Sequence, residues 1–346
     1  MQPILAISDL AVSFQSGVGR DSRYLRAVDG VSLNIPPRAA VGLVGESGSG
    51  KSVTALSLLR LLPQPPARIE GGQLLFTRPG SGPDSGPSET IDILKLDDEE
   101  LRKLRGGHIS MIFQEPMTAL NPVYAIGDQL GEALRAHQPL SRREGLARAV
   151  ELLDLVGVPD AARRTHDYPH QLSGGQRQRV MIAMALSCRP SLVIADEPTT
   201  ALDVTTQAQI LDLLGRLQAE MGMSMLLISH DLGVVSAVCQ HVAVMYAGQI
   251  VESAPSRTLF RWASHPYTAG LLQALPRLGG RQERLQEIPG RVPRLGEMPS
   301  GCRFADRCPR VESRCREEAP LLRSLGEKEH LVRCHFPLNA GPGGGA

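Results

Sequence analysis

The segment Gly45-Glu46-Ser47-Gly48-Ser49-Gly50-Lys51-Ser52 holds the most informative pattern in this chain of 346 residues. It fits G-x-x-x-x-G-K-[ST], in which glycines let backbone N–H groups turn inward around phosphate oxygens. The apolar run 40–44 before it indicates a buried strand, and a helix-competent run begins at Val53, so a helix N-terminus adds positive charge. We assign residues 45–53 to nucleotide binding. We expect Lys51 to reach the β- and γ-phosphates and Ser52 to ligate Mg²⁺.

A pair of carboxylates forms the second part of this pattern. The apolar run 192–195 ends in Asp196 and Glu197, and a similar run covers 225–228. Continuous apolar runs suit a parallel sheet that is covered on both faces. Asp196 is placed to hold Mg²⁺ through water, and Glu197 to orient or deprotonate the attacking water. Because Pro198 follows, the pair taken alone could also be an acidic N-cap. The phosphate loop favours the metal-site interpretation.

A second anion-binding turn precedes the helix-competent segment 177–187. It consists of Ser173, Gly174, Gly175 and Gln176, which offer a hydroxyl, glycine amides and a helix N-terminus. An ordinary helix-capping turn is the alternative. A nucleotide already held by the first loop has little need for a second cradle, so we expect a dimer in which each cradle faces the partner's γ-phosphate.

The three motifs, in this order, resemble those of the ATP-binding cassette family over residues 1–255. The resemblance implies an α/β fold: a P-loop NTPase with a RecA-like core, an antiparallel β subdomain and a helical subdomain at about 115–185. It implies that Gln114 contacts Mg²⁺ or the water and senses a membrane partner. Asp203, in Ala201-Leu202-Asp203, matches a loop that crosses the dimer interface, and His230 matches a histidine that contacts the γ-phosphate.

Each of these three residues also has an ordinary structural interpretation: a loop amide for Gln114, a turn residue for Asp203 and a satisfied strand-end histidine for His230. Their joint spacing favours the functional one. Phe14 lies where the family places an aromatic ring against adenine, and Tyr24 is a weaker candidate.

Several kinds of cassette ATPase differ from this chain. Chromosome-maintenance ATPases separate the two phosphate motifs by a long coiled coil, translation-factor cassettes carry two cassettes in one chain, and exporters usually add membrane helices. A separate importer ATPase subunit remains. Four segments resemble those of dipeptide/oligopeptide permease ATPases and of the similar nickel-uptake ATPases; they are residues 111–122, 168–171, 245–248 and 265–268.

That resemblance implies ATP hydrolysis coupled to transmembrane transport of peptides. The implied partners are a second cassette, identical or related, two transmembrane permease subunits and an external solute-binding protein. Nickel or another small solute is an alternative cargo, and a soluble regulatory ATPase is a weaker alternative function.

Composition excludes some other classes. The chain has 37 Lys+Arg against 36 Asp+Glu, a net charge of +1, and only 3% aromatic residues. It therefore lacks a global basic field and stacking platforms for nucleic acid. The N-terminus has no signal-peptide pattern. The uncharged run 232–251 carries Gln240 and His241 in its middle, so we interpret it as a helix, a strand and a turn. These features predict a soluble, cytosolic protein, and the permease resemblance implies a peripheral location on the cytoplasmic face of the cell membrane.

Simple patterns predict several local features. Val31, Leu33 and Ile35 alternate with polar residues, which predicts a half-buried strand. Residues 125–165 read as helical, with Leu146, Val150 and Leu153 on one face. Residues 77–90, rich in Gly, Pro and Ser, predict a surface loop, and 341–346 a disordered tail.

Four of the six cysteines crowd the C-terminal region 256–340, which we expect to form a small domain. They are Cys302, Cys308, Cys315 and Cys334. Structural zinc usually uses tighter C-x2-4-C pairs, whereas this looser spacing suits an iron–sulfur cluster. Some peptide-permease ATPases resemble this segment and carry a [4Fe–4S] cluster there. Zinc and bare or disulfide-linked cysteines are the alternatives, and His335 could replace one thiolate. Cys188 and Cys239 are expected to be buried packing residues.

Overall fold

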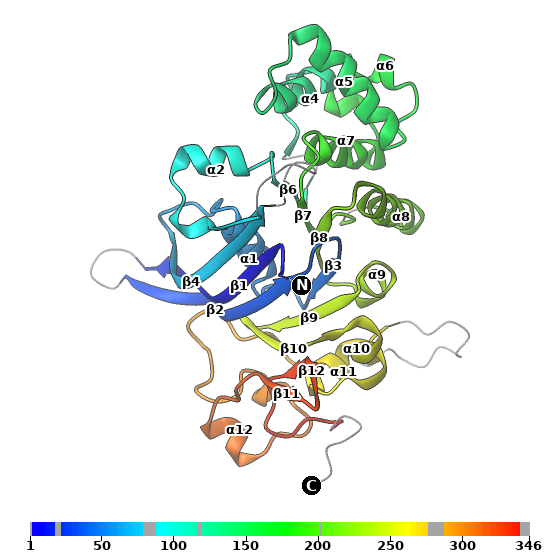
Figure 1. The fold of residues 1–346 in the computed structure, drawn as a ribbon. Helices are drawn as coiled ribbons and strands as arrows, with labels where there is room; N and C mark the ends of the chain where they lie inside the picture. Colours follow the sequence, from blue (N-terminus) through cyan, green and yellow to red (C-terminus); the bar gives the residue numbers. More distant parts are fainter. Residues whose placement is uncertain are drawn as a thin grey trace. The chain divides into compact units, whose positions relative to one another are not determined.

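The computed structural model describes residues 2–17, 22–78, 88–115, 119–200, 202–275 and 287–339. The chain folds into two compact units, and their helices and strands are labelled in Figure 1. The first unit contains residues 1–4, 35–39 and 75–228, and the second contains residues 5–34, 40–74 and 229–346.

Three parallel strands form the centre of the first unit. They are β6 (Ile109–Ile112), β7 (Leu192–Asp196) and β8 (Ser224–Ser229), with β7 in the middle. Every residue of β7 and β8 is buried, which confirms the parallel strands expected from the two apolar runs. The long helix α8 (Val204–Met221) connects β7 to β8.

Helices occupy the expected part of this unit. They are α4 (Ile126–Arg135), α5 (Arg142–Leu155), α6 (Ala161–Arg164) and α7 (Gly174–Leu186). On the predicted apolar face of α5, Leu153 is buried, whereas Leu146 is 36% exposed. A side-chain carbon on Gly145 would lie only 3.6 Å from the Cα of Gly131 in α4. These two glycines let the helices approach closely. Leu146 lies at the edge of the same contact, where its Cδ1 would be 2.7 Å from a side-chain carbon built on Gly127 of α4.

The predicted loop at residues 77–90 is wrong at both of its ends. Strand β4 (Ala67–Arg78) runs through Arg78 and pairs antiparallel with β5 (Glu89–Asp92). Polar cross-strand neighbours hold this hairpin, because Thr77 faces Thr90 and Arg78 forms an ion pair with Glu89. Residues 79–87 lie outside the described residues. A 3-10 turn (Ile93–Lys95) and α2 (Asp98–Leu104) follow.

Two groups of strands build the second unit. Strand β1 (Leu5–Ser16) lies beside β2 (Arg23–Ile35). In β2 the residues Val31, Leu33 and Ile35 are buried and their neighbours Ser32 and Asn34 are exposed, as predicted. The other strands are β3 (Ala40–Val44), β9 (His241–Tyr246), β10 (Gln249–Pro255), β12 (Glu327–Val332) and β11 (Arg323–Leu325), in that spatial order.

The C-terminal strands extend the same sheet as β9 and β10. Strands β3 and β9 are parallel, and β10 pairs antiparallel with both β9 and β12. The remaining elements of this unit are α1 (Lys51–Leu58), α9 (Leu232–Val238), α10 (Ser256–Trp262), α11 (Pro266–Gln273), α12 (Ser313–Glu317) and a 3-10 turn (Ala305–Arg307). The expected tail 341–346 lies outside the described residues.

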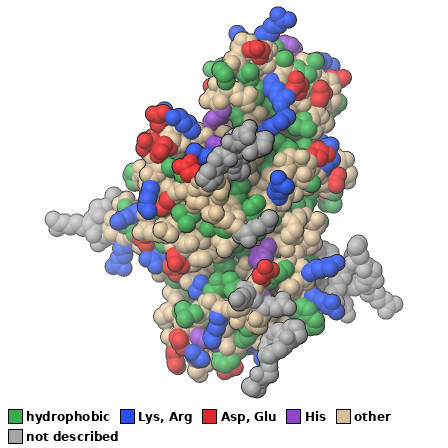
Figure 2. All heavy atoms as spheres, viewed as in Figure 1, with side chains coloured by type: hydrophobic (Ala, Val, Ile, Leu, Met, Phe, Trp, Pro, Cys, Tyr) green, Lys and Arg blue, Asp and Glu red, His purple; other side chains and the backbone are tan. Residues whose placement is uncertain are grey.

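The uncharged run 232–251 has the predicted structure. It forms α9, then β9, then a turn through Ala247 and Gly248 into β10. In the part of the chain that the structure describes, no helix has the length and apolarity to cross a membrane. On the face drawn in Figure 2, acidic and basic side chains are interspersed, in agreement with the near-zero net charge.

Candidate functional site

The phosphate loop connects β3 to α1 in the second unit. Gly50 has φ 104°, a left-handed conformation that only glycine adopts readily, and a side chain there would lie 2.9 Å from the Ala27 carbonyl. Lys51 is 4% exposed. Its ammonium Nζ donates to the carbonyl oxygens of Gly45 (2.8 Å) and Glu46 (3.0 Å), so it lies across the loop. The Ser49 hydroxyl is buried and has no hydrogen-bond partner among the described residues. Such an unsatisfied donor fits a loop built for a polar ligand.

Two side chains that the sequence reasoning missed support this loop. The Tyr267 hydroxyl accepts a hydrogen bond from the Glu46 backbone N–H (2.9 Å), and Arg307 forms an ion pair with the Glu46 carboxylate (3.1 Å). Tyr267 lies in the segment 265–268 that suggested the permease resemblance, and Arg307 immediately precedes Cys308. No other feature of the sequence indicated that Tyr267 and Arg307 would contact Glu46, which lies far from both in the chain.

The acidic pair lies at the carboxyl end of β7. Asp196 is 4% exposed. The Glu197 carboxylate Oε2 accepts hydrogen bonds from the Gln114 amide (3.3 Å) and the Thr200 hydroxyl (3.0 Å). Gln114 follows β6, the parallel neighbour of β7, so the carboxyl ends of adjacent strands bring Gln114 and Glu197 together. The N-cap alternative is wrong, because the next helix, α8, begins only at Val204.

Ser173 and Asp203 both cap helices of the first unit. Ser173 begins α7 with a capping box: its hydroxyl accepts from the Gln176 N–H (3.3 Å), and the Gln176 side chain accepts from the Ser173 N–H (3.0 Å). Asp203 begins α8, and hydrogen bonds from Thr206 lower the pKa of its carboxyl group. Gly174 and Gly175 form the first turn of α7. Ala201 lies outside the described residues.

The other predicted nucleotide contacts belong to the second unit. His230 is exposed and follows β8, one residue before the N-cap of α9. Phe14 is half-buried in β1. Tyr24 is 46% exposed and lies beneath the Arg68 guanidinium, 5.7 Å from the ring centre. The adenine contact stays a prediction.

The four C-terminal cysteines line one pocket, together with Phe304 and His335. All are free thiols, so the disulfide alternative is wrong. Burial raises the pKa of each of Cys302, Cys308 and Cys334, the last to about 11. Among the described residues, no three His, Cys, Asp or Glu side chains are placed to hold a single metal ion. Of the two packing cysteines, Cys239 is buried as predicted, whereas Cys188 is only partly buried because it lies just beyond the end of α7.

A phosphate loop after one strand and an acidic strand end on another define a nucleotide-hydrolysing protein of the P-loop class. Residues 28–200 match the family model "ABC transporter", and residues 251–315 match "Oligopeptide/dipeptide transporter, C-terminal region".

Similar proteins agree with these matches. One is the "Putative peptide import ATP-binding protein" of Brucella melitensis, 53% identical over 96% of this chain and 97% of its own length. Another is the "Probable peptide ABC transporter ATP-binding protein" of Sinorhizobium fredii, 48% identical over 96% of this chain and 94% of its own.

Solved structures show the same fold. A dimeric ATP-binding cassette in a post-hydrolysis state, bound to ADP and Pi, has a TM-score of 0.60 at 29% identity and covers 73% of this chain and 99% of its own. A cassette from Clostridium perfringens, part of an ABC transporter complex, has a TM-score of 0.59 at 26% identity, covering 75% and 92%. This chain belongs to the ABC transporter family.

Proposed function

We propose that this chain is the ATP-hydrolysing subunit of an importer for di- and oligopeptides, peripheral on the cytoplasmic face of the cell membrane. The observation that carries the proposal is the presence, on one chain, of the cassette motifs and the C-terminal region 251–315 that matches the oligopeptide/dipeptide transporter model. The full-length similarity to proteins named for peptide import supports the same substrate class. We place the boundary between the cassette and this C-terminal region near residue 255, after β10.

In this proposal each predicted site residue has a role toward ATP. Residues 45–53 hold the phosphates, with Lys51 on the β- and γ-phosphates, and Phe14 contacts the base. Glu197 acts as general base for the attacking water, while Gln114 and His230 orient the water and the γ-phosphate. Ser52, Gln114 and Asp196 offer oxygen donors, the type that Mg²⁺ prefers. When bound, Mg²⁺ neutralises charge that develops on the phosphates.

The second anion-binding turn, residues 173–176, acts on the nucleotide of a second cassette. Ser173, Gly174, Gly175 and Gln176 close on the partner's γ-phosphate, and Asp203 contacts the partner across the dimer. The capping box of Ser173 and Gln176 already shapes this turn, so its N–H groups are pre-organised for an anion. Two permease subunits, contacted near Gln114, and an external binding protein complete the importer.

For the C-terminal cysteines we propose a [4Fe–4S] cluster. The donor set fits, since four free thiols line one pocket. Among the described residues no three His, Cys, Asp or Glu side chains are placed to hold a metal ion, so the proposal rests on the shared pocket and on the spacing of the four cysteines. The cluster would supply folding energy to this segment.

Transport is tested by reconstitution. The chain is co-expressed with two permease subunits, placed in vesicles with the binding protein, and assayed for ATP-dependent uptake of a labelled tripeptide. Glu197→Gln is the matched inactive control. Uptake of tripeptide but not nickel supports the proposal. Nickel uptake alone, or failure of permease subunits to co-purify, would overturn it.

The cluster is tested on protein purified without oxygen. Iron and sulfide counts of about four each, with a broad visible absorption, are expected. Cys315→Ser should lose them, while Cys188→Ser, outside the pocket, should keep them. One zinc and no iron, or retention of iron in Cys315→Ser, would refute the cluster.

A further inference from the structure

Arg307 of the C-terminal cysteine segment, residues 302–334, contacts the phosphate loop. Arg307 lies in the 3-10 turn between Cys302 and Cys308, and its side chain is 6% exposed. Its Nη1 donates to the Glu46 carboxylate (3.1 Å). Nε and Nη2 donate to the carbonyl oxygens of Pro289 (2.9 Å) and Ile288 (3.2 Å). These two hydrogen bonds hold the guanidinium in position independently of its contact with the loop.

Aromatic rings form the other side of this contact. The guanidinium carbon lies 5.7 Å from the centre of the Tyr246 ring, and Nη1 also reaches the Tyr246 hydroxyl (3.4 Å). Tyr246, Tyr267 and Phe304 pack with ring centres 4.7 to 5.4 Å apart. Phe304 is adjacent to the cysteine pocket, so one aromatic cluster joins the cysteine segment to the loop. Hydrogen bonds to Tyr246 and Glu46 raise the pKa of Arg307 against the effect of its burial.

Glu46 depends on Arg307 for its charge balance. Its Oε2 accepts from Arg307, whereas its Oε1 is buried and without a hydrogen-bond partner in the described ranges. Glu46 is the second residue of a loop whose other members bind phosphate in the proposed function. Without Arg307 the carboxylate would place an uncompensated negative charge beside the negative phosphates of ATP. In a partly buried site such a charge is weakly screened.

We propose that Arg307 is a positioning residue for the phosphate loop: by neutralising Glu46 and fixing it from the cysteine segment, it sets the affinity of the loop for ATP. The inference rests on the proposed nucleotide role of residues 45–53. Through the Arg307–Glu46 contact, ATP binding and the folded structure of the cysteine segment are thermodynamically linked, so each stabilises the other.

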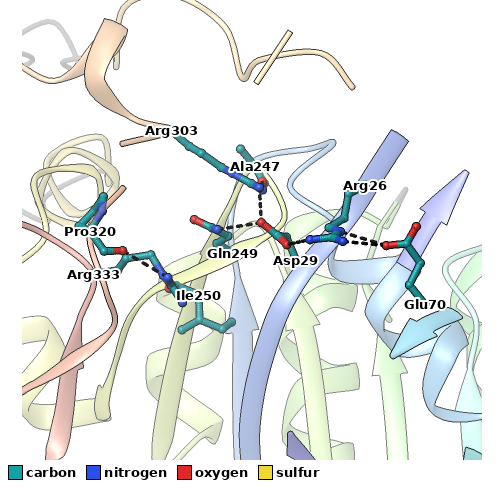
Figure 3. A network of polar contacts seen from close by, with 9 residues as sticks. All are labelled: Arg26, Asp29, Glu70, Ala247, Gln249, Ile250, Arg303, Pro320 and Arg333. Atoms are coloured by element: carbon teal, nitrogen blue, oxygen red, sulfur yellow. Dashed lines mark hydrogen bonds and ion pairs between the residues drawn. The ribbon is translucent and has the colours of Figure 1, made fainter. Parts of the chain in front are cut away.

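Arg307 could instead have a purely structural role, which would be to hold the cysteine segment in place. Arg303 is the matched control for that role, because Arg303 comes from the same segment and is similarly enclosed. Its guanidinium bonds to Asp29 and to the Ala247 carbonyl and does not involve Glu46 (Figure 3). Figure 3 also shows Arg26 reaching Asp29 from another side, so the carboxylate keeps a partner when Arg303 is removed.

The experiment measures equilibrium binding of a fluorescent ATP analogue, ATPase kinetics and Tm on the full chain. The variants are Arg307→Met, Glu46→Gln, the double variant and Arg303→Met. Arg307→Met should raise both Kd and KM by about tenfold, with kcat within about twofold. The double variant should recover Kd to within about threefold of wild type, because the unbalanced charge is gone. Arg303→Met should lower Tm and leave Kd within about twofold.

Two outcomes would overturn the proposal. A double variant that binds as weakly as Arg307→Met would show that charge balance is not the cause, and an equal loss in Arg303→Met would assign the effect to the segment's fold. If Arg307→Met does not fold, Arg307→Lys decides: it keeps a positive charge beside Glu46, so a Kd within about threefold of wild type supports the proposal, and a greater loss contradicts it. Binding of the ATP analogue is measured without transport. A failed peptide-uptake assay would therefore not change the conclusion about Arg307.

Discussion

The side-chain amide of Gln114 donates a hydrogen bond of 3.3 Å to Oε2 of Glu197, at the carboxyl ends of the parallel strands β6 and β7. The Thr200 hydroxyl donates to the same oxygen from 3.0 Å. Two donors thus fix one carboxylate oxygen. This geometry suits a general base whose orientation must be held before substrate arrives.

The first prediction concerns Glu197. Glu197→Gln keeps the side-chain shape but cannot accept the water proton, so ATP hydrolysis should fall at least about 100-fold. Binding of a non-hydrolysable ATP analogue should stay within about threefold, because the phosphate loop is unchanged. Phosphate release and analogue binding are measured on the same preparation. Thr200→Val, which removes only one of the two donors, is the control and should retain most activity. Turnover near wild type in Glu197→Gln would remove Glu197 from the base role.

The second prediction separates the capping role of Ser173 from its proposed role across the dimer. Ser141 offers a matched control, since it begins α5 with the same kind of capping box. Each Ser→Ala change should cost about 1 kcal/mol of stability through the lost cap. Only Ser173→Ala should also lower ATPase activity, by about tenfold or more, while single-site nucleotide binding stays intact. Unfolding midpoints and ATPase rates are compared. Equal ATPase activity in the two variants would show that Ser173 acts only as a helix cap.

The third prediction is a pH dependence carried by His265. This side chain is 1% exposed, and burial lowers its pKa from 6.5 to about 4. Its ring Nδ1 accepts from the Tyr267 N–H (3.1 Å), and the nearby charged groups are Glu252 and Arg333. Between pH 6.5 and 4 the unfolded chain binds a proton that the folded chain does not. Stability therefore falls as pH falls through this window, with a contribution of about 2 kcal/mol by pH 5.

His265→Asn tests that dependence. Asparagine keeps an acceptor for the helix start but does not titrate. The variant should have a lower Tm at pH 7 and a smaller loss of Tm between pH 7 and 5 than the wild-type protein. Differential scanning fluorimetry at both pH values measures the difference. Parallel pH profiles in the two proteins would show that His265 does not control the acid sensitivity.

The sequence predicted those strands whose burial produces a continuous or alternating pattern of apolar residues. Strands β3, β7 and β8 are buried on both faces and read as uninterrupted apolar runs, and β2 is half-buried and alternates. The partial exposure of Leu146 in α5 could not be predicted, because the close approach of α4 and α5 depends on Gly131 of another helix.

The C-terminal strand β12 and the role of Arg307 escaped prediction for a different reason. The β12 sequence Glu-Lys-Glu-His-Leu-Val is largely charged, and its pairing with β10 connects segments far apart in the chain. The buried carboxylate of Glu252 in β10 accepts from His330 of β12 (2.9 Å). A polar pair of this kind replaces the apolar pattern that would have identified the strand.

The last prediction concerns how closely α9 approaches β3. A side-chain carbon built on Gly42 would overlap Cγ1 of Val235, and it would lie 3.4 Å from the Cys239 sulfur. Because both neighbours are buried, they have little space to move. Gly42→Ala should therefore destabilise the protein by about 1–3 kcal/mol. Gly71→Ala is the matched control, since nothing lies within 4 Å of the same atom there. It should leave stability unchanged or raise it slightly, because alanine restricts the unfolded chain. Urea unfolding midpoints of the two variants measure the contrast. Equal midpoints would mean that α9 can shift away from β3, and that the strand preceding the phosphate loop tolerates a looser cover.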